Sequence, residues 1–173
     1  MRSVLKALCV AVLLCAGLAV SHAQTRVALV VGNATYRAAS RLANPPNDAG
    51  DVAAALRRLG FSVTFLGDVD YDRMRRALLE FSRAAGQAEI AVVYFAGHGI
   101  ELGGENYLVP IDAELRSDRD VEHETMPLRS VMASVAPARR LGLVVLDACR
   151  DDPFRPRMVQ TAERSPDGDA RAR

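Results

Sequence analysis

The stretch AEIAVVYFAGHG (residues 88–99) joins a nearly continuous apolar run to a histidine flanked by two glycines. An apolar run without alternation is typical of a parallel strand that is covered on both faces. Three further stretches have the same character: RVALVVGN (26–33), FSVTFLGD (61–68) and RLGLVVLDAC (140–149). These four runs predict the strands of one mainly parallel sheet.

Helical patterns lie between the strands. Residues 47–60 place apolar side chains on one face, and Asn47 and Asp48 are natural N-caps for this helix. Residues 70–86 form a second amphipathic pattern, and a weaker helix is expected over 126–135. The alternation of strands and helices predicts an α/β domain with helices flanking the sheet.

The first 23 residues have the features of a secretory signal peptide: a basic start, an apolar run and small residues before Ala23. This predicts export, to the periplasm or out of the cell, without a membrane association after cleavage. The folded domain is then expected over residues 24–154, with a small hairpin around 100–110. Residues 155–173 are polar and aperiodic, which predicts a disordered tail.

Removal of the predicted signal changes the cysteine and charge counts. Cys9 and Cys15 leave with it, so Cys149 is the single remaining cysteine and no internal disulfide can form. The chain has 22 Lys and Arg and 21 Asp and Glu; losing Arg2 and Lys6 leaves 20 against 21. This near-neutral balance gives no reason to expect nucleic acid as a partner.

Cys149 and His98 end two of the predicted strands. If these strands are neighbours, both side chains emerge at the same edge of the sheet, where an imidazole can take the proton of a thiol. The backbone amides of Gly99 and Cys149 are candidates for an oxyanion hole. Singly, the cysteine could be a small buried apolar residue and the histidine a turn residue; together they favour a catalytic dyad. No metal site is expected, because a third ligand at zinc spacing is absent.

Four blocks in order carry a family resemblance: ALVVGNATY (28–36), LANPPNDAGDVAAALRRLGF (42–61), VVYFAGHGIELGGENYLVPIDA (92–113) and VVLDACRDDPF (144–154). They resemble the metacaspases and bacterial caspase-like cysteine peptidases. The resemblance implies a caspase–haemoglobinase sandwich whose last strands are missing after Phe154.

The resemblance also implies functional roles. His98 matches the general base and acid, and Cys149 matches the nucleophile of an endopeptidase acting on proteins or peptides. Metacaspases cleave after arginine or lysine, and the aspartates of their acidic pocket match Asp48 and Asp147. Asp48 could instead cap a helix and Asp147 could be a turn residue.

Other readings of the sequence differ in function. A caspase-like module without activity would act through protein binding, which the short C-terminal segment favours. A nucleotide-binding α/β domain is disfavoured because GNATY (32–36) lacks the glycine fingerprint. No cofactor is expected, although the resemblance would allow calcium activation through Asp112 and the acidic pair Glu122 and Glu124. The sequence leaves the oligomeric state open.

Overall fold

The computed structural model describes residues 25–149 and 153–160 of the 173-residue chain, with Cys149 described by its backbone. The predicted signal peptide over residues 1–23 and the last part of the predicted tail, residues 161–173, lie outside the described residues. Within the described part of the chain, no helix is long and apolar enough to cross a membrane.

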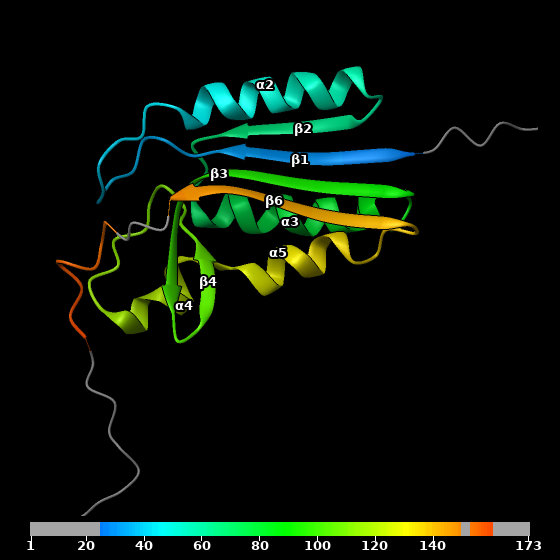
Figure 1. Ribbon diagram of the computed structural model, residues 1–173. Coiled ribbons are helices and arrows are strands. Elements are labelled where there is room, and N and C mark those ends of the chain that lie inside the picture. The colour runs from blue at the N-terminus through cyan, green and yellow to red at the C-terminus, as the bar shows by residue number, and fades with distance from the viewer. Residues whose placement is uncertain (1–24, 150–152, 161–173) are drawn as a thin grey trace, which may run out of the picture.

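Four parallel strands form the main part of the sheet, in the order β2-β1-β3-β6 (Figure 1). Their bounds are β1 (Arg26–Gly32), β2 (Ser62–Gly67), β3 (Ile90–Leu102) and β6 (Leu141–Cys149). The predicted parallel α/β architecture is therefore confirmed, and each of the four apolar runs forms one strand.

Helices cover both faces of this sheet (Figure 1). Helix α2 packs on one face over β1, β2 and β3, while α3 and α5 pack together on the other. The helices are α2 (Pro45–Arg58), α3 (Tyr71–Ala85), α5 (Leu128–Val135) and the short η1 (Asp118–Asp120) and α4 (Val121–Glu124).

The predicted hairpin is formed by the last four residues of β3 and by β4 (Glu105–Leu108). Gly103 and Gly104 connect the two strands, with φ angles of 61° and 81°. Two successive positive φ angles are what a tight two-residue hairpin turn requires, and glycine adopts them without steric cost. The short β5 (Met126–Pro127) then pairs with β4.

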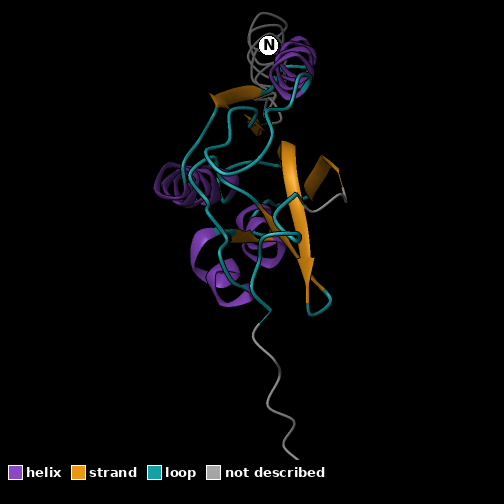
Figure 2. Cartoon of the chain, turned by 90° about the vertical axis from the view of Figure 1, so that its left-hand side faces the viewer, coloured by secondary structure: helices purple, strands orange, loops and turns teal. Residues whose placement is uncertain are grey.

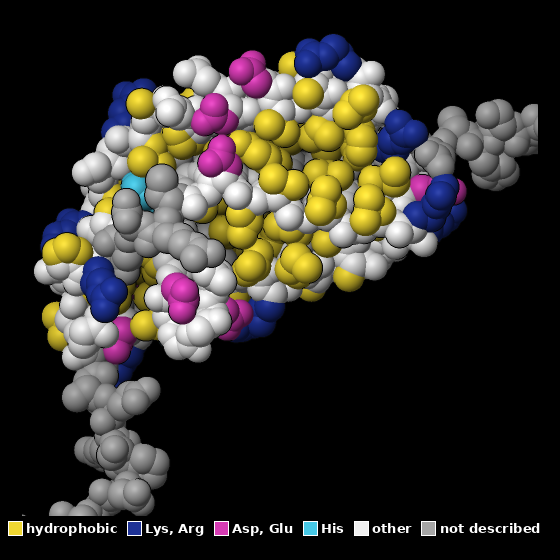
Figure 3. Space-filling view, in the orientation of Figure 1, with side chains coloured by type: hydrophobic (Ala, Val, Ile, Leu, Met, Phe, Trp, Pro, Cys, Tyr) yellow, Lys and Arg dark blue, Asp and Glu magenta, His cyan; other side chains and the backbone are white. Residues whose placement is uncertain are grey.

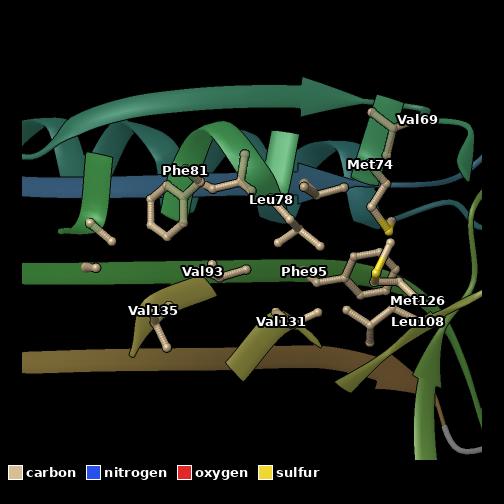
Figure 4. Packing of buried hydrophobic residues seen from close by; sticks show 14 residues of the cluster. Val69, Met74, Leu78, Phe81, Val93, Phe95, Leu108, Met126, Val131 and Val135 are labelled. Atoms are coloured by element: carbon tan, nitrogen blue, oxygen red, sulfur yellow. The ribbon is translucent and has the colours of Figure 1, made fainter. Parts of the chain in front are cut away.

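The largest apolar cluster lies between the sheet and the helices α3 and α5 (Figure 4). Met74, Leu78 and Phe81 from α3 meet Val93 and Phe95 from β3, all of them buried. These three α3 residues form the stripe that the helical periodicity of residues 70–86 predicts. This packing places β3 at the centre of the domain.

Helix α2 begins earlier than predicted, and Asn47 and Asp48 are not its N-caps. Asn44 is the N-cap and Pro45 is the first helical residue, so Asp48 lies in the first turn. Proline is favoured at this position because its fixed φ suits a helix and its missing N–H is not needed there. A Cβ atom at Gly32 would lie 2.8 Å from the Pro45 carbonyl oxygen. The glycine therefore lets α2 start directly beside the end of β1.

Residues 155–160 differ from the expected disordered tail. Met158 is buried in the cluster that also contains Phe154, and the Val159 N–H donates to the Arg116 carbonyl at 2.8 Å. Two apolar side chains spaced four residues apart thus dock a segment whose composition is otherwise polar. The packed domain extends beyond Phe154 as a result.

Asn33 is fully buried directly after β1. Its Oδ1 accepts a hydrogen bond from the Val69 N–H at 2.9 Å, and its Nδ2 donates to the Val109 carbonyl at 3.2 Å. The amide therefore ties the end of β1 to the loops that follow β2 and β4, all at the carboxyl end of the sheet.

Asn33→Ala is expected to lower the free energy of unfolding by about 2–4 kcal/mol, because it leaves buried backbone groups without partners. Urea denaturation measures this loss. The control is Asn106→Ala, at an exposed position on β4, for which we expect a change within about 0.5 kcal/mol. Equal stabilities of the two variants would contradict this role of Asn33.

Candidate active site

The parallel strands end together, and loops gather over their carboxyl ends (Figure 2). In the register between β3 and β6, His98 is the direct partner of Cys149. The two strands are therefore neighbours, and the backbones of these residues lie side by side at the edge where α/β proteins commonly place their sites. The side chain of Cys149 lies outside the described part of the structure.

His98 is more buried than an edge position suggests, with 5% of its surface exposed. Its Nε2 lies 3.2 Å from the carbonyl oxygen of Ser40. A carbonyl oxygen only accepts hydrogen bonds, so in the neutral ring Nε2 carries the proton and Nδ1 keeps a lone pair. Nδ1 is buried and has no hydrogen-bond partner among the described residues. The ring is thus held in the form that can accept a proton at Nδ1.

Tyr36 supports His98 from the loop after β1. The Tyr36 hydroxyl accepts a hydrogen bond from the His98 N–H at 2.8 Å, and the two ring centroids are 4.5 Å apart. Burial raises the pKa of Tyr36, while the hydrogen bond from His98 opposes this and the charge of Asp68 adds to it. A Cβ atom at Gly97 would lie 2.5 Å from the Tyr36 hydroxyl oxygen. The first glycine of the GHG motif therefore makes room for this support.

Phe154 packs on another side of the imidazole. It is fully buried, and its ring lies edge-on to His98 at a centroid distance of 6.3 Å. Ser40, Tyr36 and Phe154 were not among the predicted site residues. Ser40 acts through its backbone carbonyl, so its side-chain type carries no sequence signal. Tyr36 and Phe154 lie in two of the blocks that carry the resemblance, but their contacts with His98 arise from the tertiary fold.

Asp68 holds the loop that carries Tyr36. Its Oδ1 accepts hydrogen bonds from the N–H groups of Ala34 at 2.7 Å and Thr35 at 2.9 Å. Burial of the carboxylate opposes ionisation, but these hydrogen bonds and the charge of Arg41 together leave the pKa of Asp68 below its usual value. The ionised carboxylate is therefore the form that stabilises the loop.

A lowered pKa in the folded state gives a stabilisation that is present above the unfolded pKa, about 3.9 for aspartate, and is lost as the pH falls through the folded value. The wild-type protein is therefore expected to exceed Asp68→Asn in Tm from pH 5 to 8, and this difference is expected to shrink below about pH 4. Thermal melts of both proteins across this range measure it. A difference that stays constant down to pH 2 would contradict the role of the ionised carboxylate.

The two predicted pocket carboxylates lie near one tyrosine. The Tyr94 hydroxyl on β3 donates to Asp147 Oδ2 at 3.0 Å. Burial is the largest cause of the raised pKa of Tyr94, followed by the hydrogen bond and charge of Asp147 and then the charge of Asp48. The fold thus brings Asp48, in the first turn of α2, and Asp147, on β6, into the electrostatic range of the same hydroxyl group.

Gly99 lies beside the last residues of β6. A Cβ atom on Gly99 would be 3.3 Å from the Cβ of Ala148. Both residues line a cavity of about 270 Å³ between the hairpin and β6. The predicted oxyanion hole from the amides of Gly99 and Cys149 stays a prediction, and the position of Gly99 next to this open space is compatible with it.

Two of the three carboxylates considered for calcium, Asp112 and Glu124, have other partners. Asp112 Oδ1 accepts from the Tyr71 N–H at 2.9 Å, and Glu124 Oε2 accepts from the N–H groups of Glu114 and Leu115. Within residues 25–149 and 153–160, no three His, Cys, Asp or Glu side chains group as metal ligands. Here these two carboxylates order the loops between β4 and α5.

Comparison with known proteins identifies the family. A family model described as "Caspase domain" matches residues 25–171. The chain belongs to the caspase-domain family. This membership confirms the caspase-like fold that the resemblance implied. It also supports, in general terms, a function as a cysteine peptidase.

Two curated relatives match a shorter stretch of the chain. The mucosa-associated lymphoid tissue lymphoma translocation protein 1 of Homo sapiens is 37% identical over 91 residues, and its Mus musculus homolog is 35% identical over 91 residues. Each match covers 53% of this chain and 11% of the relative. The chain therefore corresponds to a small part of these longer proteins.

Proposed function

We propose that this caspase-domain chain hydrolyses peptide bonds after arginine or lysine, with Cys149 as the nucleophile and His98 as the general base and acid. The buried Nδ1 of His98 is the observation that carries the proposal. It keeps its lone pair because Nε2 donates to the Ser40 carbonyl, and it belongs to the residue paired with Cys149. A thiol next to such a nitrogen can transfer its proton to this nitrogen and form the thiolate that acts as the nucleophile.

In the proposed reaction, the Cys149 thiol gives its proton to His98 Nδ1, and Sγ attacks the carbonyl carbon of the scissile bond. The C–N bond breaks as the imidazolium returns this proton to the leaving amine, which leaves a thioester on Sγ. Water then attacks the thioester and passes a proton through His98 to the thiol. The products are an amine and a carboxylic acid, with Cys149 and His98 restored.

Hydrogen-bond donors are needed to stabilise the negative charge that develops on the carbonyl oxygen of the scissile bond. We assign the backbone N–H groups of Gly99 and Cys149 to this role. The open space beside Gly99 and Ala148 supports the assignment, because a substrate carbonyl has room there. The chemistry as proposed uses no cofactor.

Asp48 and Asp147 are assigned to substrate selection. A guanidinium or ammonium group is recognised best by carboxylates that are held in place and accept charge-assisted hydrogen bonds. The Tyr94 hydroxyl fixes the Asp147 carboxylate by donating to one of its oxygens, which leaves the other oxygen available to a substrate. The predicted signal peptide would place this activity on proteins or peptides outside the cytoplasm.

The proposal is tested with the purified 173-residue chain and three reporter peptides that differ only in an arginine, lysine or aspartate before the cleaved bond. We expect cleavage of the arginyl and lysyl reporters and no cleavage by Cys149→Ala. Full activity of Cys149→Ala would contradict the nucleophile. A preference for the aspartyl reporter would contradict the acidic pocket, but it would not contradict Cys149 as the nucleophile. A well-folded chain that cleaves none of them would favour a binding module.

A further inference from the structure

Four segments of the chain meet at the end of the sheet where the parallel strands begin, opposite the proposed active site. They are residues 25–27, 57–62, 83–90 and 136–141. The Glu89 N–H donates to the Thr25 carbonyl at 2.8 Å, and the Arg139 N–H donates to the Ala88 carbonyl at 3.0 Å. Residues 57–62 join them because β1 pairs with β2. The four segments therefore form one surface, which we call the amino-end surface.

The amino-end surface is strongly basic. Its arginines are Arg26, Arg57, Arg58, Arg83, Arg139 and Arg140. Arg26 is half-buried and the other five are exposed. The four segments contain one acidic residue, Glu89, which pairs with Arg140 at 3.3 Å, and Glu80 lies one turn before Arg83 on α3. Figure 3 shows basic side chains at the right-hand end of the molecule, where the strands of Figure 1 begin.

Two exposed leucines lie among these arginines. Leu59 directly follows Arg58 and is 60% exposed. Leu141 directly follows Arg140 and is 49% exposed. The Arg26 guanidinium donates to the Leu59 carbonyl at 2.7 Å, which holds the end of α2 beside the start of β1. Arginine and leucine together suit the boundary of a lipid bilayer, where apolar side chains enter the acyl region and guanidinium groups stay among the headgroups.

Helix ends explain only part of this pattern. Arg57, Arg58 and Arg83 lie in the last turns of α2 and α3, where a basic side chain stabilises the helix dipole. Arg139 and Arg140 lie in no last turn, because α5 ends before them. The exposed leucines have no role at a helix dipole either. Nucleic acid would attract the arginines but would leave the leucines in water. A partner that is both anionic and apolar fits the whole surface.

The chain enters the domain at this end. Thr25 is the first described residue and directly precedes β1, and the apolar run ALCVAVLLCAGLAV (7–20) comes before it in the sequence. While the predicted signal peptide is in a membrane, the amino-end surface is the part of the domain attached nearest to it. From Ile90 to His98, β3 extends about 26 Å away from this surface, at 3.3 Å per residue.

We propose that the amino-end surface binds a membrane that contains anionic lipids, with the proposed active site facing away from the bilayer. The guanidinium groups bind lipid phosphates, and Leu59 and Leu141 enter the acyl boundary. The surface belongs to the folded domain, so it binds after cleavage of the predicted signal peptide as well. This departs from the expectation of no membrane association after cleavage, because a local excess of charge drives such binding and the net charge does not.

The test is flotation of the 173-residue chain with vesicles of phosphatidylcholine, with and without about 30% phosphatidylglycerol. We expect at least about tenfold stronger binding to the anionic vesicles, decreasing as salt is added. Arg139→Glu with Arg140→Glu should weaken binding to the anionic vesicles by at least about tenfold. The matched control is Arg75→Glu with Arg76→Glu, which makes the same charge change at exposed positions on α3 and should bind within about threefold of the wild type.

The leucines give a test of the bilayer as the partner. Leu59→Gln should weaken binding to the anionic vesicles by about threefold or more, whereas Leu79→Gln, at a 51% exposed position on α3, should not. Circular dichroism checks that all variants are folded.

Three outcomes would overturn the proposal. They are equal binding of the wild type to both kinds of vesicle, equal binding of the two double arginine variants, and equal binding of the two leucine variants. Tighter binding to a DNA duplex than to the anionic vesicles would assign the surface to nucleic acid and overturn the proposal as well. None of these outcomes depends on peptide hydrolysis, which is measured separately with the reporters.

Discussion

His98→Gln is expected to lower kcat/KM for an arginyl reporter by about 10³-fold or more, because the thiol then lacks a general base and the leaving amine lacks a general acid. Glutamine is close in size to histidine and can still donate a hydrogen bond to the Ser40 carbonyl that holds the ring. The change therefore removes proton transfer at Nδ1 while keeping most of the packing against Tyr36 and Phe154.

The matched control for this prediction is His123→Gln, at an exposed position on α4. It should keep the wild-type kcat/KM. Circular dichroism and Tm of both variants separate lost chemistry from lost folding. An active His98→Gln with an unchanged Tm would contradict the role of His98, and an inactive but unfolded variant would be replaced by His98→Asn for the same measurement.

Asp147→Asn is expected to lower kcat/KM for an arginyl reporter by about 10- to 100-fold, because a hydrogen bond between charged groups is replaced by a weaker one. Asparagine keeps an oxygen that can accept from the Tyr94 hydroxyl, so the geometry around β3 should persist. Asp48→Asn is expected to have an effect in the same range, since its charge also acts at Tyr94.

The readout that distinguishes substrate selection from general damage is the ratio of arginyl to uncharged reporter cleavage. This ratio should fall in Asp147→Asn and Asp48→Asn and stay unchanged in the control Asp72→Asn, at an exposed position in the first turn of α3. If kcat/KM falls by the same factor for the arginyl and the uncharged reporter, the carboxylates do not select the substrate.

The sequence was sufficient to predict the strands and the main helices because their apolar patterns are local. β3 and β6 are continuous apolar runs, and the stripe on α3 has the period of a helix. Local patterns also predicted that His98 and Cys149 end parallel strands, and such ends meet at one edge of a sheet. That these two strands are neighbours was left as a condition, which the pairing of β3 with β6 fulfils.

The surroundings of His98 could not be predicted in the same way. The Ser40 carbonyl is a backbone atom brought close by the loop after β1, and the Tyr36 contact needs the space left at Gly97. The docking of the segment after β6 depends on two apolar residues, Phe154 and Met158. An argument from the average composition of the segment does not detect two single residues. These features depend on tertiary packing between distant parts of the chain.

The most direct test of the central proposal is the rate at which iodoacetamide alkylates Cys149 at pH 6, mapped by mass spectrometry of the folded chain. An ordinary thiol with a pKa near 8.5 is only about 0.3% ionised at pH 6 and reacts slowly. We predict fast alkylation of Cys149 in the wild type and slow alkylation in His98→Gln, because Nδ1 of His98 takes the thiol proton. Equally slow alkylation in both proteins would contradict a Cys149–His98 dyad.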